Sequence, residues 1–229
     1  MSETNEPQMK IIARIHSDFP EKFGIPRQAG LVPELVSKIV FEPEFRDPNA
    51  LRGIEEWSHL WIIWQFSENI RKDWSPTVRP PRLGGNERVG VFATRSPFRP
   101  NPIGLSSVKL EKVVDEGSLG TVLYVSGADI MDGTPIYDIK PYLAYTDSHP
   151  DASGSFAAEH FDHSLEVDFP SGLIEKIPRD KHSAVIGMLS NDPRPAFQND
   201  PERVYSLMFA EVEIKFKVDG KKLSVIDVF

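Results

Sequence analysis

The sequence LWIIWQF at residues 60–66 indicates which class of fold this 229-residue chain can adopt. The run is long enough for one β-strand but short for a helix, and β-branched and aromatic residues dominate it. Similar runs recur through the first part of the chain, with turn residues at most of their ends. They lie at residues 10–17, 38–41, 89–94, 105–114 and 121–127.

Strands at this spacing, with few helical stretches between them, are typical of an antiparallel barrel or sandwich rather than of an alternating βα fold. The segment LRGIEEWSH at residues 51–59 is expected to form one short helix ahead of the strand. We therefore predict a mainly β protein. Its antiparallel β-barrel-like domain spans residues 9–150, and a small α+β domain spans residues 165–229.

The second domain follows a polar segment at residues 146–165, which is typical of a domain boundary. Residues 179–190 (RDKHSAVIGMLS) predict a helix that ends before the two prolines of NDPRP. Residues 203–218 alternate between apolar and polar side chains. Asp219-Gly220 then predicts a hairpin turn into residues 222–229.

Composition excludes several classes of protein. A hydrophobic fraction of 40% supports a real core, and the absence of cysteine excludes disulfides, a thiolate nucleophile and cysteine-based zinc sites. No apolar run approaches the roughly 18 residues that cross a bilayer, and the polar, acidic N-terminus does not resemble a secretory signal. The simplest expectation is a cytoplasmic protein with no membrane segment.

Charge is distributed unevenly. The chain carries a formal net charge of −8, yet residues 71–100 hold seven Lys and Arg against two Asp and Glu. Within this region, residues 76–104 (PTVRPPRLGGNERVGVFATRSPFRPNPIG) contain six prolines and four glycines. Such residues hold backbone amides and long side chains at set positions, which suits a site for an anionic ligand such as phosphate or RNA.

Two further segments are candidates for chemistry. The tripeptide Pro26-Arg27-Gln28 is a weak signal alone. The acids Asp129, Asp132 and Asp138 surround a Gly-Thr-Pro turn and could grip a ribose diol or a cation, or could accept hydrogen bonds from their own turn. Neither an EF-hand pattern nor a complete zinc ligand set is visible, so no metal site is predicted. A Walker P-loop and a dinucleotide-binding glycine motif are also absent.

Three blocks together are far more specific: PRQAGL at 26–31, GVFATRSPFRPNPIGLS at 90–106 and DGTPIYDIKPY at 132–142. Their order and wording resemble the TrmO (TsaA-like) family of tRNA methyltransferases. RGIEEWSHLWIIWQF at 52–66 and DPRPAF at 192–197 are also similar to that family. The resemblance implies a homodimeric β-barrel enzyme that uses S-adenosylmethionine to methylate N6 of threonylcarbamoyl-adenosine (t6A) at position 37 of threonine tRNA.

The resemblance also implies roles for particular residues. Family members can carry a His-Gln pair where this chain has Ser67-Glu68, so contacts there would have to use the backbone. An arginine suits the carboxylate of the cofactor, and an aspartate suits its ribose diol. The implied cofactor-binding residues are Pro26, Arg27, Gln28, Ser67, Glu68, Arg95, Leu105, Asp132, Gly133, Thr134 and Pro135.

The tRNA would meet the basic segment. The candidate phosphate contacts are Arg79, Arg82, Arg88 and Arg99. Because the acceptor nitrogen carries a proton, a base could assist the transfer, and Asp138 and Tyr142 are candidates between which the sequence does not choose. An aromatic side chain such as Phe98 or Tyr142 could stack on the splayed base.

Three alternatives stay open on the residues alone. The barrel could be a non-catalytic module that binds a nucleotide or RNA. It could transfer a methyl group to a small molecule instead of tRNA. Finally, the three aspartates could serve a metal-dependent hydrolase.

Overall fold

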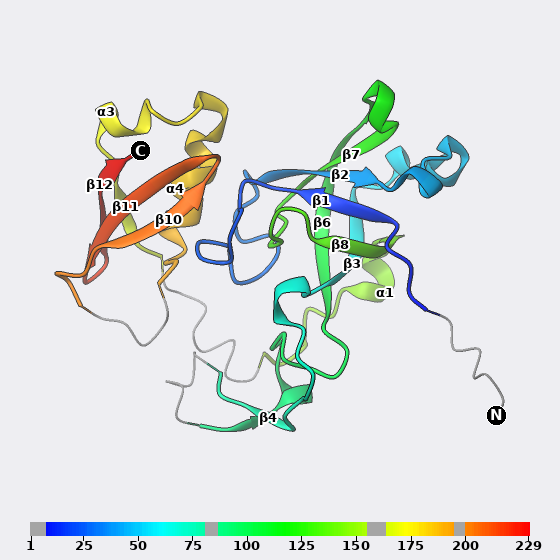
Figure 1. Cartoon of the computed structure of the whole chain (residues 1–229), viewed down its shortest axis with the longest axis horizontal. Coiled ribbons are helices and arrows are strands. Elements are labelled where there is room, and N and C mark those ends of the chain that lie inside the picture. The colour runs from blue at the N-terminus through cyan, green and yellow to red at the C-terminus, as the bar shows by residue number, and fades with distance from the viewer. Residues whose placement is uncertain (1–7, 81–86, 155–163, 195–199) are drawn as a thin grey trace.

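Six antiparallel strands close into a barrel in the order β1-β2-β7-β6-β3-β8, which confirms the predicted mainly β fold (Figure 1). The structure is a computed structural model, and it describes residues 8–80, 87–154, 164–194 and 200–229. The barrel closes where β8 pairs with β1. Its strands are β1 (Ala13–His16), β2 (Val36–Phe41), β3 (His59–Gln65), β6 (Ile103–Asp115), β7 (Thr121–Ser126) and β8 (Pro135–Pro141).

Strand β3 shows why its sequence is apolar throughout. Leu60, Ile62 and Trp64 are buried and belong to the barrel core. The alternate residues Trp61 and Ile63 are half-buried on the outer face, opposite Ser107 and Leu105 of β6. A strand with one solvated face would alternate with polar residues. Part of this apolar outer face is covered by the chain itself, because the Trp61 indole donates to Asp147 at 2.7 Å and packs against Tyr142.

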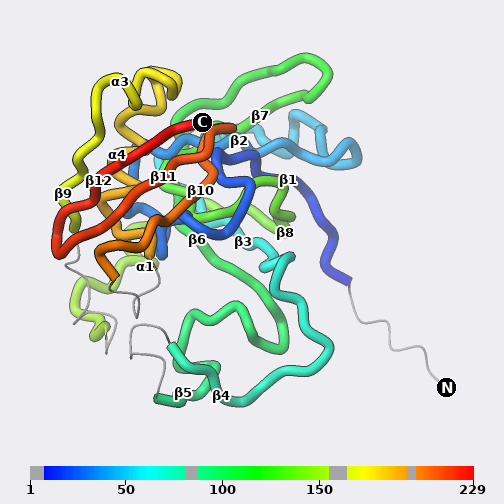
Figure 2. Tube along the Cα trace, turned by 60° about the vertical axis from the view of Figure 1, so that its left-hand side comes forward, coloured from blue at the N-terminus to red at the C-terminus, as the bar shows by residue number. Residues whose placement is uncertain are grey.

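Two local predictions differ from the structure. Residues 51–59 form no α-helix: short 3₁₀ turns at Pro48–Leu51 and Ile54–Glu56 flank Gly53, whose φ of 83° breaks the helical path. Residues 89–94 form only a two-residue strand, β5 (Val89–Gly90), before a 3₁₀ turn. β5 pairs with β4 (Thr77–Val78), and this small sheet projects away from the barrel (Figure 2).

The C-terminal part is a four-stranded sheet in the order β10-β11-β12-β9. Its strands are β9 (Glu166–Asp168), β10 (Tyr205–Phe209), β11 (Val212–Asp219) and β12 (Lys222–Val228), and its helices are α3 (Ser171–Ile174) and α4 (His182–Ser190). A further short helix, α1 (Ala144–Asp147), follows β8. The predicted helix at 179–190 is confirmed over α4, where Ala184, Val185, Met188 and Leu189 are buried.

The alternating run at 203–218 is two strands rather than one. Ala210 and Glu211 turn the chain between β10 and β11 with positive φ angles of 47° and 69°. Neither residue is typical of such a turn, which usually carries Asn or Gly. The Ala210 amide donates to the Asp18 carbonyl at 3.0 Å, so a distant segment helps to hold the turn.

The loop between β1 and β2, residues 17–35, packs into the C-terminal core rather than into the barrel (Figure 1). Phe19 lies edge-on to Phe209 with ring centroids 5.5 Å apart. Lys181 forms an ion pair with Asp18 at 2.5 Å. The barrel and the C-terminal sheet are therefore joined through this loop, which we call the β1–β2 loop.

Candidate active site

A small cavity of about 640 Å³ lies at one end of the barrel. That volume is within the range of small-molecule sites. Its walls come from five places: the β1–β2 loop, the end of β3 with the following turn, the loop at 94–99, the start of β6, and the segment 129–134. Segments far apart in the sequence thus meet around one space.

The floor of the small cavity rests on a close approach between two strands. Trp64 and Gly104 are register partners, and a Cβ on Gly104 would lie 2.2 Å from the indole ring. The Trp64 indole Nε1 donates to the Ser106 hydroxyl at 3.0 Å. Ser106 donates in turn to Asp129 Oδ1 at 2.6 Å. The tryptophan and the carboxylate are therefore linked by one polar chain.

Asp129 is the unusual carboxylate of this cavity. Burial raises its pKa above the ordinary range of an aspartate. The Ser106 hydroxyl, nearby backbone amides and the charge of Arg95 favour the ionised form and oppose that increase. Perturbed groups in a cleft are candidates for function. Sequence reasoning considered Asp129 only as part of an acidic cluster.

The predicted tripeptide meets the predicted arginine at this cavity. Arg95 Nη1 donates a short hydrogen bond to Gln28 Oε1. Arg27 reaches the C-terminal part, where its Nη2 donates to the Arg194 carbonyl at 2.8 Å. Pro26, Arg27, Gln28 and Arg95 all line the small cavity, together with Ser67, Glu68 and Leu105.

The Asp-Gly-Thr-Pro turn is placed differently. Asp132 Oδ1 accepts from the Ser17 amide at 3.0 Å and lies 3.4 Å from His16 Nδ1. Gly133 adopts φ 72° in the turn, and Thr134 is buried and lines the small cavity. Asp132, Gly133 and Pro135 are not among the residues that line it. The turn thus ties the cavity wall to the end of β1.

Asp138 and Tyr142 are not among the residues that line either cavity. Asp138 pairs with Lys140 at 2.8 Å. The Tyr142 ring packs against Trp61 and His59, with centroids 5.4 and 6.2 Å away. The structure thus does not bring these two candidates to the cofactor-sized space.

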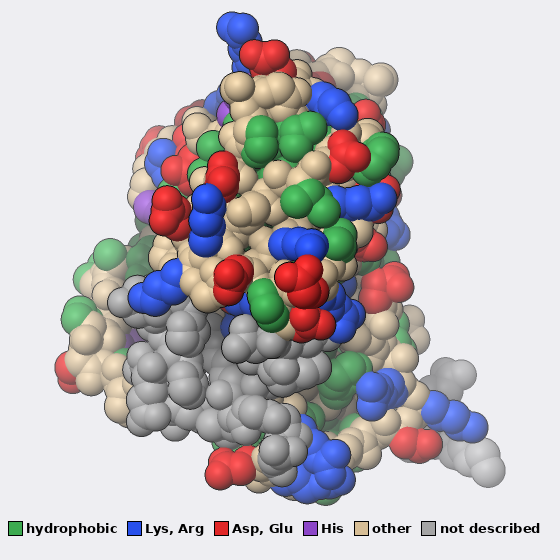
Figure 3. All heavy atoms as spheres, turned by 90° about the vertical axis from the view of Figure 1, so that its left-hand side faces the viewer, with side chains coloured by type: hydrophobic (Ala, Val, Ile, Leu, Met, Phe, Trp, Pro, Cys, Tyr) green, Lys and Arg blue, Asp and Glu red, His purple; other side chains and the backbone are tan. Residues whose placement is uncertain are grey.

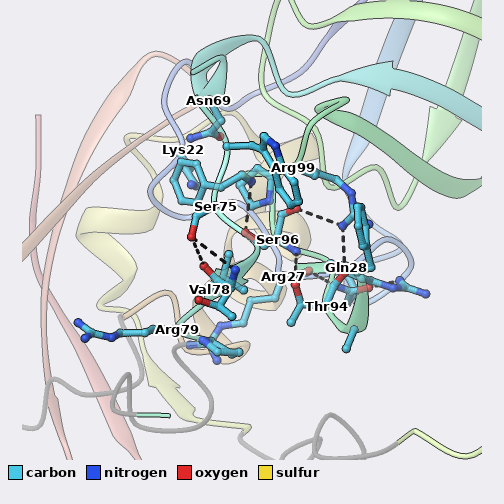
Figure 4. A pocket seen from close by; sticks show the side chains of 18 of the residues that line it. Lys22, Arg27, Gln28, Asn69, Ser75, Val78, Arg79, Thr94, Ser96 and Arg99 are labelled. Atoms are coloured by element: carbon cyan, nitrogen blue, oxygen red, sulfur yellow. Dashed lines mark hydrogen bonds between the residues drawn. The ribbon is translucent and has the colours of Figure 1, made fainter. Parts of the chain in front are cut away.

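A second, larger cavity of about 1900 Å³ is strongly basic (Figure 4). We call it the basic cavity. Among the described residues that line it, nine are Lys or Arg and one, Asp73, is acidic. Figure 4 shows Arg27, Gln28 and Thr94 grouped on one side, with Arg79 reaching away at the other edge. In Figure 3, Lys and Arg side chains gather at the lower end, where β4 and β5 lie.

The predicted phosphate contacts are distributed around the basic cavity. Arg79, Arg88 and Arg99 line it, whereas Arg82 lies outside the described residues. Arg99 Nη1 donates to the Thr94 and Ser96 carbonyls at 2.9 and 3.3 Å, so this side chain also fixes its own loop. Phe98 is covered by Arg71, whose guanidinium carbon lies 3.7 Å from the ring centroid.

The two cavities share a wall. Arg27, Gln28, Arg95 and Arg99 line both of them. A small molecule in one cavity and a polyanion in the other would therefore meet at these side chains. Sequence reasoning missed the tryptophans Trp61 and Trp64 at this site, although the unbroken apolar run at residues 60–64 was the available signal.

Within the described ranges, no three His, Asp or Glu side chains lie close enough together to hold a metal ion. No helix among those residues is long and apolar enough to cross a membrane.

A β-barrel with a small cavity that shares a wall with a basic cavity suits an enzyme that acts on nucleic acids with the help of a small cofactor. Comparison with known proteins shows the family. Residues 14–148 match the tRNA-methyltransferase O N-terminal domain and residues 162–229 match the TrmO C-terminal domain. The chain belongs to the tRNA-methyltransferase O family, whose members are methyltransferases that depend on S-adenosylmethionine.

Relatives and solved structures agree with this assignment. A tRNA (adenine(37)-N6)-methyltransferase of Escherichia coli is 40% identical, covering 92% of this chain and 93% of its own. One of Eikenella corrodens is 44% identical, covering 74% and 95%. A crystal structure of TrmO from P. aeruginosa superimposes with a TM-score of 0.79 at 30% identity, covering 100% of this chain and 99% of that one.

Proposed function

We propose that this protein transfers a methyl group from S-adenosylmethionine to N6 of adenine 37 in tRNA, and that the acceptor is t6A in threonine tRNA. The observation that carries this proposal is the shared wall of the two cavities. Arg27, Gln28, Arg95 and Arg99 stand where a cofactor and a tRNA loop would meet. Holding donor and acceptor in alignment supplies much of the acceleration of such a reaction.

The residues of the small cavity fit the cofactor. Arg95 and Gln28 form a polar pair suited to a carboxylate. The rings of Trp64 and Phe66, with centroids 4.3 Å apart, offer aromatic faces to a sulfonium cation. S-adenosylmethionine supplies the methyl group. The candidate contacts Pro26, Arg27, Ser67, Glu68, Leu105 and Thr134 line the same space.

Asp129 is our candidate for the proton acceptor, in preference to Asp138 and Tyr142. The N6 nitrogen must lose its proton as it gains a methyl group, and an acylated nitrogen is a weak nucleophile. Asp129 lines the small cavity, and the hydrogen bond from Ser106 fixes its Oδ1. Burial raises its pKa, which makes the carboxylate a stronger base than an exposed aspartate.

The basic cavity accounts for the choice of a nucleic acid over a small acceptor. Nine basic residues against one acid give far more positive charge than one small molecule needs. Arg79 and Arg88 follow and precede the two strands of the small sheet, so they present charge together at one end. Each phosphate that such a side chain neutralises adds to the salt dependence of binding.

We also propose that the protein acts as a homodimer in the cytoplasm. Leu105 and Ile103 are 57% and 37% exposed on the outer face of β6, beside Trp61 and Ile63 of β3. Exposed apolar side chains gathered on one face are typical of an interface. Light scattering that gives the mass of a single chain at micromolar concentration would refute the dimer.

The decisive experiment is methyl transfer from labelled S-adenosylmethionine to threonine tRNA with and without the t6A modification. We expect label only on the modified tRNA. Label on both tRNAs would leave the methyltransferase and remove the t6A requirement. No label on either, with cofactor binding shown by calorimetry, would favour a small-molecule acceptor or a sensing module.

A further inference from the structure

Two aromatic side chains stand exposed at the edge of the basic cavity. Trp74 is 52% exposed and Phe92 is 71% exposed, and both line the cavity. Their ring centroids are 6.0 Å apart at an interplanar angle of 33°. Large apolar side chains that are exposed next to one another are typical of a binding site.

The small sheet fixes the two rings side by side. Thr77 pairs with Gly90, and the Val91 amide donates to the Pro76 carbonyl at 2.9 Å, which extends the ladder by one bond. Trp74 lies three residues before β4 begins, and Phe92 lies two residues after β5 ends. The two rings are therefore neighbours because their backbones are paired, although 17 residues separate them in sequence.

Charge surrounds the aromatic pair. Arg71 and Lys72 lie three and two residues before Trp74, with Asp73 between, and Arg79 and Arg88 lie at the opposite end of the same small sheet. All four basic residues line the basic cavity. Because an extended chain advances at most about 3.6 Å per residue, the Cα atoms of Trp74 and Arg79 are at most about 18 Å apart. A few nucleotides of single strand can span that length.

We propose that Trp74 and Phe92 form a stacking platform for an unpaired base of the tRNA anticodon loop. The proposal rests on the function proposed above and names how the substrate is gripped. Sequence-independent binders of single-stranded nucleic acid combine a positive groove with aromatic faces on which bases stack. Phe98 is a poorer platform because Arg71 already covers its ring. A protein partner would find this cavity less suitable, since nine cations would need matching acids.

The test measures RNA affinity of the full-length protein. The probe is a fluorescein-labelled RNA hairpin with the sequence of a threonine tRNA anticodon arm, and the readout is anisotropy at several salt concentrations. Trp74→Ala and Phe92→Ala should each weaken binding about 5- to 100-fold, because stacking on one aromatic ring contributes roughly that factor. Trp74→Phe should retain most of the affinity.

The salt dependence separates stacking from charge. For Trp74→Ala and Phe92→Ala, the slope of log affinity against log salt should equal that of wild type, because no ion is released by stacking. Arg79→Gln should lower the slope by about one unit. Phe229→Ala is the matched control, since Phe229 is 63% exposed at the far end of the molecule (Figure 1).

Each outcome decides the proposal. Unchanged affinity in both alanine variants refutes the platform, as does a loss of affinity equal to that of Phe229→Ala. A changed oligomeric state with unchanged RNA affinity also refutes it and assigns the rings to a subunit contact. Methyl transfer by wild type is measured separately: its absence would overturn the proposed function, whereas the anisotropy would still decide whether the rings bind RNA.

Discussion

Replacing Gly104 with alanine tests how the floor of the small cavity is built. The new Cβ would lie 2.2, 2.5 and 2.6 Å from three atoms of the Trp64 indole. Carbon atoms in contact prefer about 3.5 Å or more, so the ring would have to move by roughly 1.3 Å. Trp64 is 7% exposed and packs against Phe66, which leaves little room for that movement.

The energetic cost follows from two contributions. Overpacking a core by one methyl group costs about 1–3 kcal/mol. Moving the indole also weakens its hydrogen bond to Ser106, which contributes about 0.5–1.5 kcal/mol. We therefore expect Gly104→Ala to lower the free energy of unfolding by about 2–4 kcal/mol, and to weaken binding of S-adenosylmethionine because Trp64 lines that cavity.

Denaturant unfolding with an unchanged m-value measures the loss, and calorimetry measures cofactor binding. Gly90→Ala is the matched control, because a Cβ there meets nothing within 4 Å and the φ of −56° suits alanine. The double variant Gly104→Ala/Trp64→Phe should cost less than the two single changes combined. If Gly104→Ala were as stable as Gly90→Ala, the close approach would not control this site.

Three more predictions follow from the same site. Asp129→Asn should lower kcat about 10²- to 10⁴-fold while cofactor binding persists, and full activity would exclude Asp129 as the base. Because burial raises the pKa of the folded carboxyl, ionisation of Asp129 opposes folding as pH rises through that pKa. The variant should therefore be at least as stable as wild type at pH 7. Asp192→Asn should destabilise the fold by about 3 kcal/mol, because the carboxylate accepts from the buried Arg194 at 2.8 Å. It should also raise the KM for S-adenosylmethionine, because the Arg194 carbonyl accepts a hydrogen bond from Arg27. Destabilisation with an unchanged KM would show that Arg194 does not position Arg27 for the cofactor. Hydrogen bonds from the Leu143 amide and then the Trp61 indole lower the pKa of Asp147. Its contribution to stability is therefore present above about pH 4 and is lost as pH falls through the lower folded pKa. Asp147→Asn should reduce the change of the unfolding midpoint with pH below pH 4, and a slope equal to that of wild type would contradict this.

The sequence predicted the barrel because its strands carry their own signal. Residues 60–66 are mostly aromatic and β-branched, and the structure forms β3 over His59–Gln65. The turn at Ala210 and Glu211 could not be predicted in the same way, because its left-handed angles are held by the Asp18 carbonyl, a contact between distant segments. Local propensity does not encode such a contact.

In the candidate site too, features that are local in the sequence could be predicted, whereas contacts between distant segments could not. The basic segment was readable from charge and proline content. The resemblance implied Gln28 and Arg95 separately as cofactor contacts, and the structure brings the two side chains together. The chain from Trp64 through Ser106 to Asp129 was not readable, since it joins three strands or segments whose proximity only the closed barrel creates.

The β1–β2 loop has a thermodynamic consequence, because its Phe19 and Val32 belong to the C-terminal core while Pro26 and Gln28 line the small cavity. A ligand that binds the loop and stabilises its conformation should therefore also stabilise the C-terminal sheet against which the loop packs. Occupancy of the small cavity should slow amide hydrogen exchange in β10 and α4, far from any contact with the ligand. The local stability of the C-terminal sheet would then depend on whether the methyl donor is bound.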